Sequence, residues 1–220
     1  MANPEARARE VTLLDINNDG LIDFVQGSLA DGQREVEAPP TIFVQNPDGT
    51  FTDAGEDLGY TYNEGYGLEY AVLADLDNDG QMELIQKQPF QVFDTSGETL
   101  TDITDSIFND LFPENQRGLT DLAVEDFNGD TIPDFFFPSW TTDRHQLVLS
   151  GPDGWNDASA ASGIASVNFR TTDGAGVATG DFDNDADIDM IVLDRRTGGT
   201  DYLLSNDGCL LYTSPSPRDS

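Results

Sequence analysis

A short acidic loop occurs four times along this chain, and each copy lies between two short apolar runs. The four copies are residues 15–23, 75–83, 126–134 and 181–189, here called the first to fourth loops. Each has an oxygen-bearing side chain at its positions 1, 3, 5 and 9. Calcium takes about six to eight oxygen ligands, so this spacing predicts a tight turn wrapped around a hard cation. Fourfold recurrence makes chance a poor explanation.

The predicted ligands are these side-chain oxygens together with the backbone carbonyl at position 7. They are Asp15, Asn17, Asp19, Leu21 and Asp23 in the first loop, Asp75, Asp77, Asp79, Gln81 and Glu83 in the second, Asp126, Asn128, Asp130, Ile132 and Asp134 in the third, and Asp181, Asp183, Asp185, Asp187 and Asp189 in the fourth. We expect up to four Ca²⁺ ions. The alternative is an Asx-rich turn without an ion, particularly where Thr131 and Ala186 replace the glycine of position 6.

The flanks of the loops exclude the EF-hand, which needs a glutamate at position 12 and a helix on each side. Position 12 holds Gln26, Gln86, Phe137 and Val192. The neighbouring segments are short runs of branched and aromatic residues, such as Val11–Leu14 before the first loop, and such runs are typical of buried strands. Each loop is therefore predicted to connect two strands of a hairpin.

The repeat is about 50–60 residues long, because the loops start at residues 15, 75, 126 and 181. A second hairpin signal recurs in phase with the loops. It is clearest in Phe43–Asp53 and Leu147–Asp157 and weaker at 92–102 and 202–208. Two hairpins per repeat give a four-stranded sheet, and strand repeats of this period predict an all-β fold, a β-propeller. The predicted blades lie near 11–60, 61–115, 116–170 and 171–208.

The acidic loops, together with hairpins of the type Asn46-Pro-Asp-Gly-Thr-Phe-Thr-Asp53, resemble the FG-GAP/VCBS repeat proteins over residues 11–208. The chain looks most similar to the branch that contains cartilage acidic protein, with its ASPIC/UnbV segment. Glycine pairs at Gly65/Gly67 and Gly174/Gly176 are similar to a pair in that family. The resemblance implies an integrin-α-like β-propeller, usually seven-bladed, with Ca²⁺ in the blade hairpins and a secreted or periplasmic location. We expect about four blades of such a ring, the alternative being a complete four-bladed ring.

The composition is strongly acidic, with 42 Asp and Glu against 10 Lys and Arg and a net charge of −32. Such a surface repels nucleic acid and anionic membranes, and it suits a salty or extracellular medium. No run approaches the roughly 20 apolar residues of a membrane span. Partners are therefore expected to be an extracellular protein or a glycan, without nucleic acid.

Both ends of the sequence depart from the repeat. Residues 1–10 lack the apolar stretch of a signal peptide. We interpret them as a truncated lead-in and the chain as a fragment without its leader, because calcium loops of extracellular modules bind at about 10⁻⁴–10⁻³ M. Residues 209–220 change to a Ser/Pro-rich string that resembles translated adapter or vector sequence, and we place them outside the fold. The alternative is a genuine flexible terminus.

The sequence offers little for catalysis. His145 is the only histidine and Cys209 the only cysteine, and His145 is expected in a loop or at a blade edge. Trp140 and Trp155 are predicted to be blade core rather than sugar-binding residues. We therefore expect a non-enzymatic, calcium-binding extracellular module for adhesion or ligand recognition, with structural ions. The alternative is the propeller part of a secreted carbohydrate-active or other hydrolytic enzyme, since carboxylates alone can hydrolyse glycosides.

Overall fold

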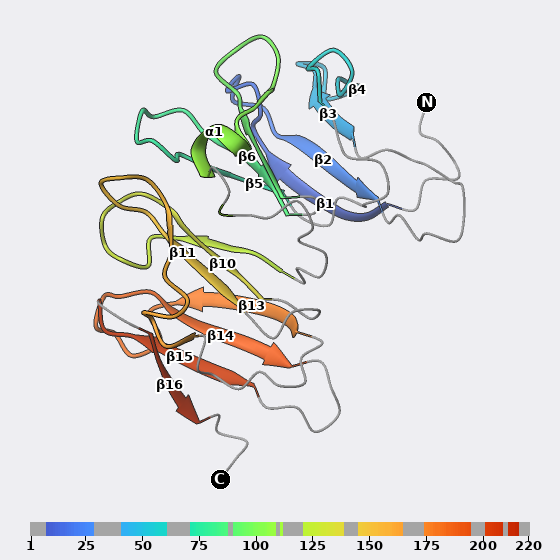
Figure 1. Cartoon of the computed structure of the whole chain (residues 1–220). Coiled ribbons are helices and arrows are strands. Elements are labelled where there is room, and N and C mark those ends of the chain that lie inside the picture. Colours follow the sequence, from blue (N-terminus) through green and yellow to red (C-terminus); the bar gives the residue numbers. More distant parts are fainter. Residues whose placement is uncertain are drawn as a thin grey trace, which may run out of the picture. The chain divides into compact units, whose positions relative to one another are not determined.

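The computed structural model describes residues 8–28, 41–60, 71–87, 90–108, 111, 121–138, 145–164, 174–194, 201–208 and 211–215. These residues form sixteen strands and a short α-helix (Figure 1). The strands make four antiparallel sheets of four strands, and within each sheet the strands follow one another in chain order. The chain thus has a nearly all-β, β-propeller-like fold, as predicted.

The elements have the following bounds. The first sheet is β1 (Ala8–Leu14), β2 (Asp23–Ser28), β3 (Thr41–Gln45) and β4 (Phe51–Asp53), and the second is β5 (Ala71–Ala74), β6 (Glu83–Gln86), β7 (Gln91–Asp94) and β8 (Thr101–Asp102). The third sheet is β9 (Ala123–Glu125), β10 (Asp134–Phe137), β11 (Gln146–Leu149) and β12 (Asn156–Asp157), and the fourth is β13 (Gly174–Gly180), β14 (Asp189–Asp194), β15 (Tyr202–Asn206) and β16 (Leu211–Pro215). Helix α1 spans Thr104–Phe108.

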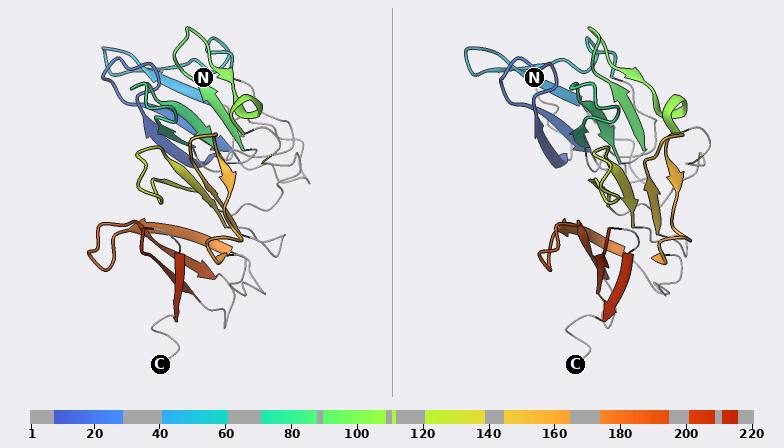
Figure 2. Two further views of the ribbon diagram at one scale, coloured as in Figure 1. Left: turned by 60° about the vertical axis from the view of Figure 1, so that its left-hand side comes forward. Right: turned by 90° about the vertical axis from the view of Figure 1, so that its left-hand side faces the viewer.

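The chain divides into two compact units, residues 1–106 and 107–220. Unit 1 contains the first and second sheets, and unit 2 contains the third and fourth. Figure 2 shows the strands of the fourth sheet in sequence, from β13 in orange to β16 in red. Each unit has its own apolar core, so each buries two sheet faces against one another.

In unit 1 the core is made by Val25 and Ile42 of the first sheet and Leu84 and Phe93 of the second, which are at most 1% exposed. Val25 lies opposite Ile42 across β2 and β3, and Leu84 lies opposite Phe93 across β6 and β7. Directly paired residues share a sheet face, so one face of each sheet enters this core. Tyr60 closes its edge, with its ring 5.7 Å from that of Phe93.

Unit 2 repeats this arrangement. Phe136 and Leu147 of the third sheet pack with Met190 and Leu204 of the fourth, and all four side chains are at most 2% exposed. Phe136 lies opposite Leu147, and Met190 lies opposite Leu204. The same motif positions therefore supply both cores, which is what a structural repeat requires.

Two predicted boundaries are wrong. Strand β1 begins at Ala8, inside the predicted lead-in of residues 1–10. Residues Leu211–Pro215, which were predicted to lie outside the fold, form β16 and pair with β15. Ladder hydrogen bonds use backbone groups, so a segment without the repeat pattern can still complete a sheet.

Four residues named from the sequence, Gly65, Gly67, Trp140 and Cys209, lie outside the described residues. Within the part of the chain that the structure describes, no helix has the length and apolar character needed to cross a membrane.

Candidate metal centres and an adjoining pocket

Each acidic loop connects the first and second strands of its sheet, as predicted. The aspartate at position 1 organises the turn by accepting backbone hydrogen bonds. In the second loop, Asp75 Oδ1 accepts from Asp79 N at 3.1 Å, and Asp75 Oδ2 accepts from Gly80 N at 2.9 Å. The other three loops repeat both bonds at 2.8–3.2 Å. Such Asx turns fold the loop back on itself and bring its oxygens together.

The turn has left-handed backbone at two positions, the fourth and the sixth, and position 4 has a φ of 55° at Asn18 and 64° at Asn78. Position 6 has a φ of 85° at Gly20 and 89° at Gly80. The same conformation is kept at Thr131, with a φ of 75°, and at Ala186, with a φ of 79°. The third and fourth loops therefore keep the turn geometry without glycine, at the energetic expense of an unfavourable conformation for an L-residue.

We expect Ala186→Gly to raise the free energy of unfolding by about 0.5–1 kcal/mol. Relief of the left-handed conformation is worth about 1–2 kcal/mol, and the added freedom of glycine in the unfolded chain offsets about 0.4–1 kcal/mol of it. Urea denaturation in EDTA measures the change. The reciprocal control is Gly80→Ala, where an added Cβ meets nothing within 4 Å, so its loss is conformational alone. If Ala186→Gly and the parent protein were equally stable, the left-handed backbone conformation of Ala186 would carry no energetic cost.

Within the described residues, two groups of acidic side chains lie close enough to share a metal ion. They are Asp75, Asp77 and Asp79 in the second loop, and Asp181, Asp183 and Asp189 in the fourth. In each group the ligand oxygens lie within 4.8 Å of one another. Two oxygens that are each about 2.4 Å from a calcium ion lie at most about 4.8 Å apart. These oxygen-only donor sets therefore fit a hard divalent cation.

The first and third loops have asparagine at position 3. In these loops the acidic side chains accept hydrogen bonds from neighbouring side chains instead of forming a group that could share an ion. In the first loop, Asn17 Nδ2 donates to Asp19 Oδ2 at 3.0 Å. In the third, Ser150 enters the loop, and its hydroxyl oxygen lies 2.9 Å from Asp130 Oδ2 and 2.7 Å from Asp134 Oδ1, so its single proton can be donated to either carboxylate. A hydroxyl between two of the predicted ligands makes the third loop the poorest fit to an ion.

Two carboxylates of the fourth loop, those of Asp183 and Asp187, have raised pKa values. Desolvation followed by the charge of Asp185 raises the pKa of both Asp183 and Asp187. A bound cation would favour the charged forms and act against this shift.

The carboxylate at position 9 has a structural role that the sequence did not reveal. Asp23, Asp134 and Asp189 are at most 1% exposed, and Glu83 is 6% exposed. Asp23 Oδ2 accepts from Ile16 N at 3.0 Å, and its Oδ1 accepts from Gln45 N at 2.8 Å. Asp134 and Asp189 make the corresponding two bonds in unit 2. The acid thus fixes the loop to the end of the third strand. Burial raises the pKa of Asp134 to about 6.

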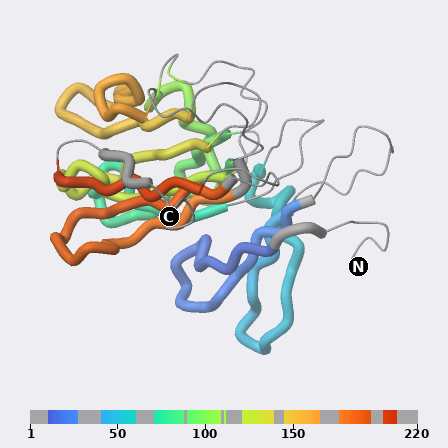
Figure 3. The backbone as a smooth tube through the Cα atoms, turned by 90° about the horizontal axis from the view of Figure 1, so that it is seen from below, coloured from blue at the N-terminus to red at the C-terminus, as the bar shows by residue number. Residues whose placement is uncertain are grey.

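A second set of residues was missed, at the end of the third strand of each sheet. Its members are Gln45, Thr95, Ser150 and Asn206. Their side chains bond the backbone next to position 9, as in the 3.1 Å bond from Ile22 N to Gln45 Oε1 and the 2.6 Å bond from Thr95 Oγ1 to Met82 O. Figure 3 shows the result in the first sheet, where the first loop (blue) and the β3–β4 turn (cyan) extend together. Aligning the repeats would have shown a polar residue at this position.

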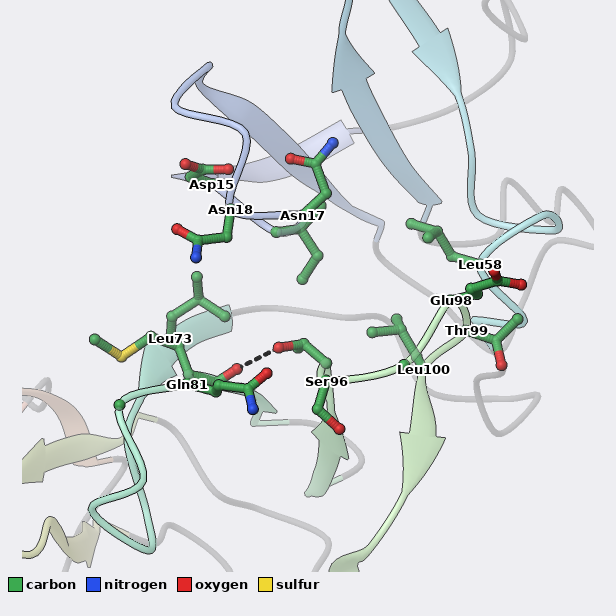
Figure 4. A pocket seen from close by; sticks show the side chains of 15 residues that line it. Asp15, Asn17, Asn18, Leu58, Leu73, Gln81, Ser96, Glu98, Thr99 and Leu100 are labelled. Atoms are coloured by element: carbon green, nitrogen blue, oxygen red, sulfur yellow. Dashed lines mark hydrogen bonds between the residues drawn. The ribbon is translucent and has the colours of Figure 1, made fainter.

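Unit 1 contains a pocket of about 530 Å³ between the loop ends of its two sheets. Figure 4 shows Asn17 and Asn18 of the first loop on one side and Gln81 and Ser96 on the other. Three leucines contribute apolar surface, and Glu98 and Thr99 of the β7–β8 turn are exposed at the pocket. These leucines are Leu58, Leu73 and Leu100. The pocket therefore offers amides, hydroxyls and the carboxylates of Asp15 and Glu98 around aliphatic side chains.

His145 and Trp155, two residues considered for catalysis or sugar stacking, pack against aromatic side chains of unit 2. His145, directly before β11, is 2% exposed and stacks on Phe136 with ring centroids 5.9 Å apart. Burial lowers its pKa to about 4. Trp155 lies 5.1 Å from Phe108 and 6.4 Å from Phe135, and its Nε1 donates to Pro133 O at 3.0 Å. Trp155 is thus part of the aromatic packing, as predicted.

Residues 15–85 match the FG-GAP-like repeat, in agreement with the FG-GAP/VCBS resemblance of the sequence. No curated protein matches the chain. The fold is similar to that of a lectin from Agrocybe aegerita that specifically recognises non-reducing terminal N-acetylglucosamine, with a TM-score of 0.55 and 15% sequence identity. The likeness covers 96% of this chain and 53% of the lectin chain, so this chain spans about half the length of that structure. At this identity the likeness concerns the fold.

Proposed function

We propose that this chain is a calcium-binding recognition module of the extracellular space, that its ions are structural, and that its ligand is a sugar residue of a glycan. The observation that carries the proposal is the pocket of unit 1, which lies directly beside the first and second loops. Asp15 and Asn17 belong both to the first loop and to the lining of the pocket.

The ionic part of the proposal rests on the donor sets. Carboxylate oxygens gathered within 4.8 Å repel one another unless a cation lies among them. A bound calcium ion would neutralise that charge and hold the loop in one conformation. In this chain the residues that would hold it are foremost the two acidic groups of the second and fourth loops.

The sugar part rests on the chemistry and size of the pocket. A volume of about 530 Å³ lies within the range of small-molecule sites. Sugar hydroxyls are donors and acceptors at once, so they suit the amides of Asn17, Asn18 and Gln81 and the hydroxyl of Ser96. The aliphatic surface of Leu73 and Leu100 suits the C–H face of a pyranose ring. The lectin with a similar fold recognises a terminal N-acetylglucosamine, which makes that sugar the first probe.

The extracellular location is supported by charge and affinity. Loops of this kind in extracellular modules bind calcium at about 10⁻⁴–10⁻³ M, a concentration that the cytosol does not provide. The net charge of −32 keeps such a surface soluble in a medium of high ionic strength.

The proposal is for binding rather than catalysis. The only histidine, His145, is 2% exposed and stacks on Phe136 within unit 2. The carbohydrate-active alternative predicts that nitrophenyl glycosides are hydrolysed, and a colorimetric assay tests it. Turnover that disappears on changing Glu98 to Gln would replace the binding function with a catalytic one.

Isothermal titration with N-acetylglucosamine in millimolar calcium tests the sugar site. We expect a dissociation constant on the order of 1 mM, which corresponds to about −4 kcal/mol. Gln81→Ala and Ser96→Ala should each weaken binding at least about threefold, because each removes a hydrogen bond worth about 1 kcal/mol. Asn156→Ala, at an exposed position on β12, is the matched control and should bind as the parent does.

Two results would contradict this function separately. If protein that calcium stabilises binds no sugar of a glycan array, the proposed sugar ligand is wrong, and the proposed structural calcium ions are unaffected. Binding that is unchanged by Gln81→Ala and Ser96→Ala would place the sugar elsewhere.

A further inference from the structure

The side chains that line the pocket of unit 1 carry charge of one sign only. Two carboxylates line it from different sheets, since Asp15 belongs to the first loop and Glu98 to the β7–β8 turn (Figure 4). No lysine, arginine or histidine is among the described residues that line it. Lys87, which follows β6 in the same unit, is 4% exposed. A charged ligand in this pocket therefore meets negative charge alone.

The two acidic loops beside the pocket strengthen its negative potential. Both contribute lining residues, and together they carry seven carboxylates, which are those of Asp15, Asp19, Asp23, Asp75, Asp77, Asp79 and Glu83. A calcium ion in each loop would add four positive charges, so an excess of three negative charges would remain. Clefts with one sign of charge and apolar walls concentrate ligands of the opposite sign. The pocket thus attracts cations and repels anions even when both loops are filled.

Glu98 is the carboxylate best placed to meet a ligand directly. In the β3–β4 turn of the first sheet, Asp48 uses its carboxylate within the turn, where it accepts from Thr50 N at 3.0 Å and from Thr50 Oγ1 at 2.6 Å. Glu98 is exposed, and within the part of unit 1 that the structure describes its carboxylate accepts no hydrogen bond and forms no ion pair. Asp15, by contrast, accepts from two amides of its own loop. The charge of Glu98 is therefore available to a cationic group of a ligand.

We propose that the ligand of this pocket is an amino sugar in its cationic form, such as a glucosamine residue with a free 2-amino group. The inference rests on the proposed function, in which the pocket holds a sugar residue. The ammonium group pairs with Glu98, and the ring hydroxyls bond Gln81 and Ser96. The same charge excludes acidic sugars, such as uronic and sialic acids, because it opposes their carboxylates. N-acetylglucosamine is neutral and binds without this contribution.

Isothermal titration with three monosaccharides of similar shape tests the preference for positive charge. Glucose, glucosamine and glucuronic acid differ at one substituent and are neutral, cationic and anionic. The titrations use the full chain in calcium at about pH 6, where an amine of this kind is protonated. We expect glucosamine to bind about threefold to fivefold more tightly than glucose, as an exposed ion pair allows. Glucuronic acid should bind at least about threefold more weakly than glucose.

Two variants locate the preference. Glu98→Gln should lower the ratio of the glucose and glucosamine dissociation constants by at least about twofold. Asp48→Asn is the matched control, because it removes an exposed carboxylate of the same unit that does not line the pocket, and its amide oxygen can still accept from Thr50. This variant should keep the ratio of the parent protein. Ethanolamine, a cation without a sugar ring, should bind at least about tenfold more weakly than glucosamine, because it lacks the ring hydroxyls.

Three results would overturn the inference and leave the proposed function standing. If N-acetylglucosamine binds but glucosamine binds no more tightly than glucose, the pocket does not select for charge. If the preference is unchanged in Glu98→Gln, the ammonium group does not pair with Glu98. If ethanolamine binds as tightly as glucosamine, the cation is attracted to the acidic surface without a sugar site. If neither N-acetylglucosamine nor any of the three monosaccharides binds, the proposed function is wrong, and this inference is wrong with it.

Discussion

Calcium at about 10 mM is expected to raise the melting temperature of this protein by about 5–10 °C for each site that binds it with a dissociation constant of about 10⁻⁴ M. An ion that binds only the folded state at a hundredfold excess over its dissociation constant adds about 2.7 kcal/mol. For a protein of this length, 1 kcal/mol shifts the melting temperature by about 2–4 °C. The carboxylates of the second and fourth loops, held within 4.8 Å of one another, are the source of the effect. Differential scanning calorimetry in calcium and in EDTA measures it.

Ionic strength needs to be matched, because salt alone screens the repulsion among 42 acidic residues. Sodium chloride at the same ionic strength is therefore the control. Equal melting temperatures in calcium, in EDTA and in the salt control would reject structural calcium ions in this chain.

The loops should also differ in their affinity for calcium. The second loop has acids at all four side-chain positions and Gly80 at the sharp turn, so it should bind calcium most tightly. The third has Asn128 in place of an acid and Thr131 in place of glycine, and Ser150 lies against its carboxylates, so it should bind calcium most weakly. Replacing both Asp75 and Asp79 by Ala should therefore remove more of the calcium stabilisation than replacing both Asp126 and Asp130. The opposite order in calorimetric titrations would mean that the turn backbone, rather than the charge count, sets the affinity.

The repeat was predictable from the sequence because its signals are local. The loops, the strands on either side and the second hairpin each depend on residues within a few positions of one another, as in Phe43–Asp53. Strand β16 was not predictable, since its pairing uses backbone groups that any sequence possesses.

The candidate ligands of the site were predicted from the sequence, but the different roles of these residues were not. Asp15 and Asp23 look alike in the sequence, but Asp23 is buried by the packing of Val25 and Ile42 on the next sheet, which no local pattern reports. The pocket was missed for a similar reason. Its lining combines Asn18, Gln81 and Glu98, whose proximity arises only when two sheets pack together.

Asp23→Ala is expected to lower the free energy of unfolding by about 2–5 kcal/mol, in EDTA as much as in calcium. Asp23 is 0% exposed, and its two oxygens accept from Ile16 N at 3.0 Å and from Gln45 N at 2.8 Å. Removing the carboxylate leaves two amides without their acceptors, and each buried unsatisfied donor is worth about 1–3 kcal/mol. Urea denaturation with and without EDTA measures both values.

Asp19→Ala in the same loop is the matched control, because Asp19 is exposed and its carboxylate accepts only local bonds, from Leu21 N at 2.8 Å and from Asn17 Nδ2 at 3.0 Å. We expect this variant to lose less than about 1 kcal/mol in EDTA, as for a solvated hydrogen bond, and to lose any stabilisation that calcium gives through the first loop. The pair thus separates the carboxylate that holds the sheet together from the one that faces the ion. If Asp23→Ala were as stable as the parent in EDTA and differed only in calcium, position 9 would be a metal ligand alone.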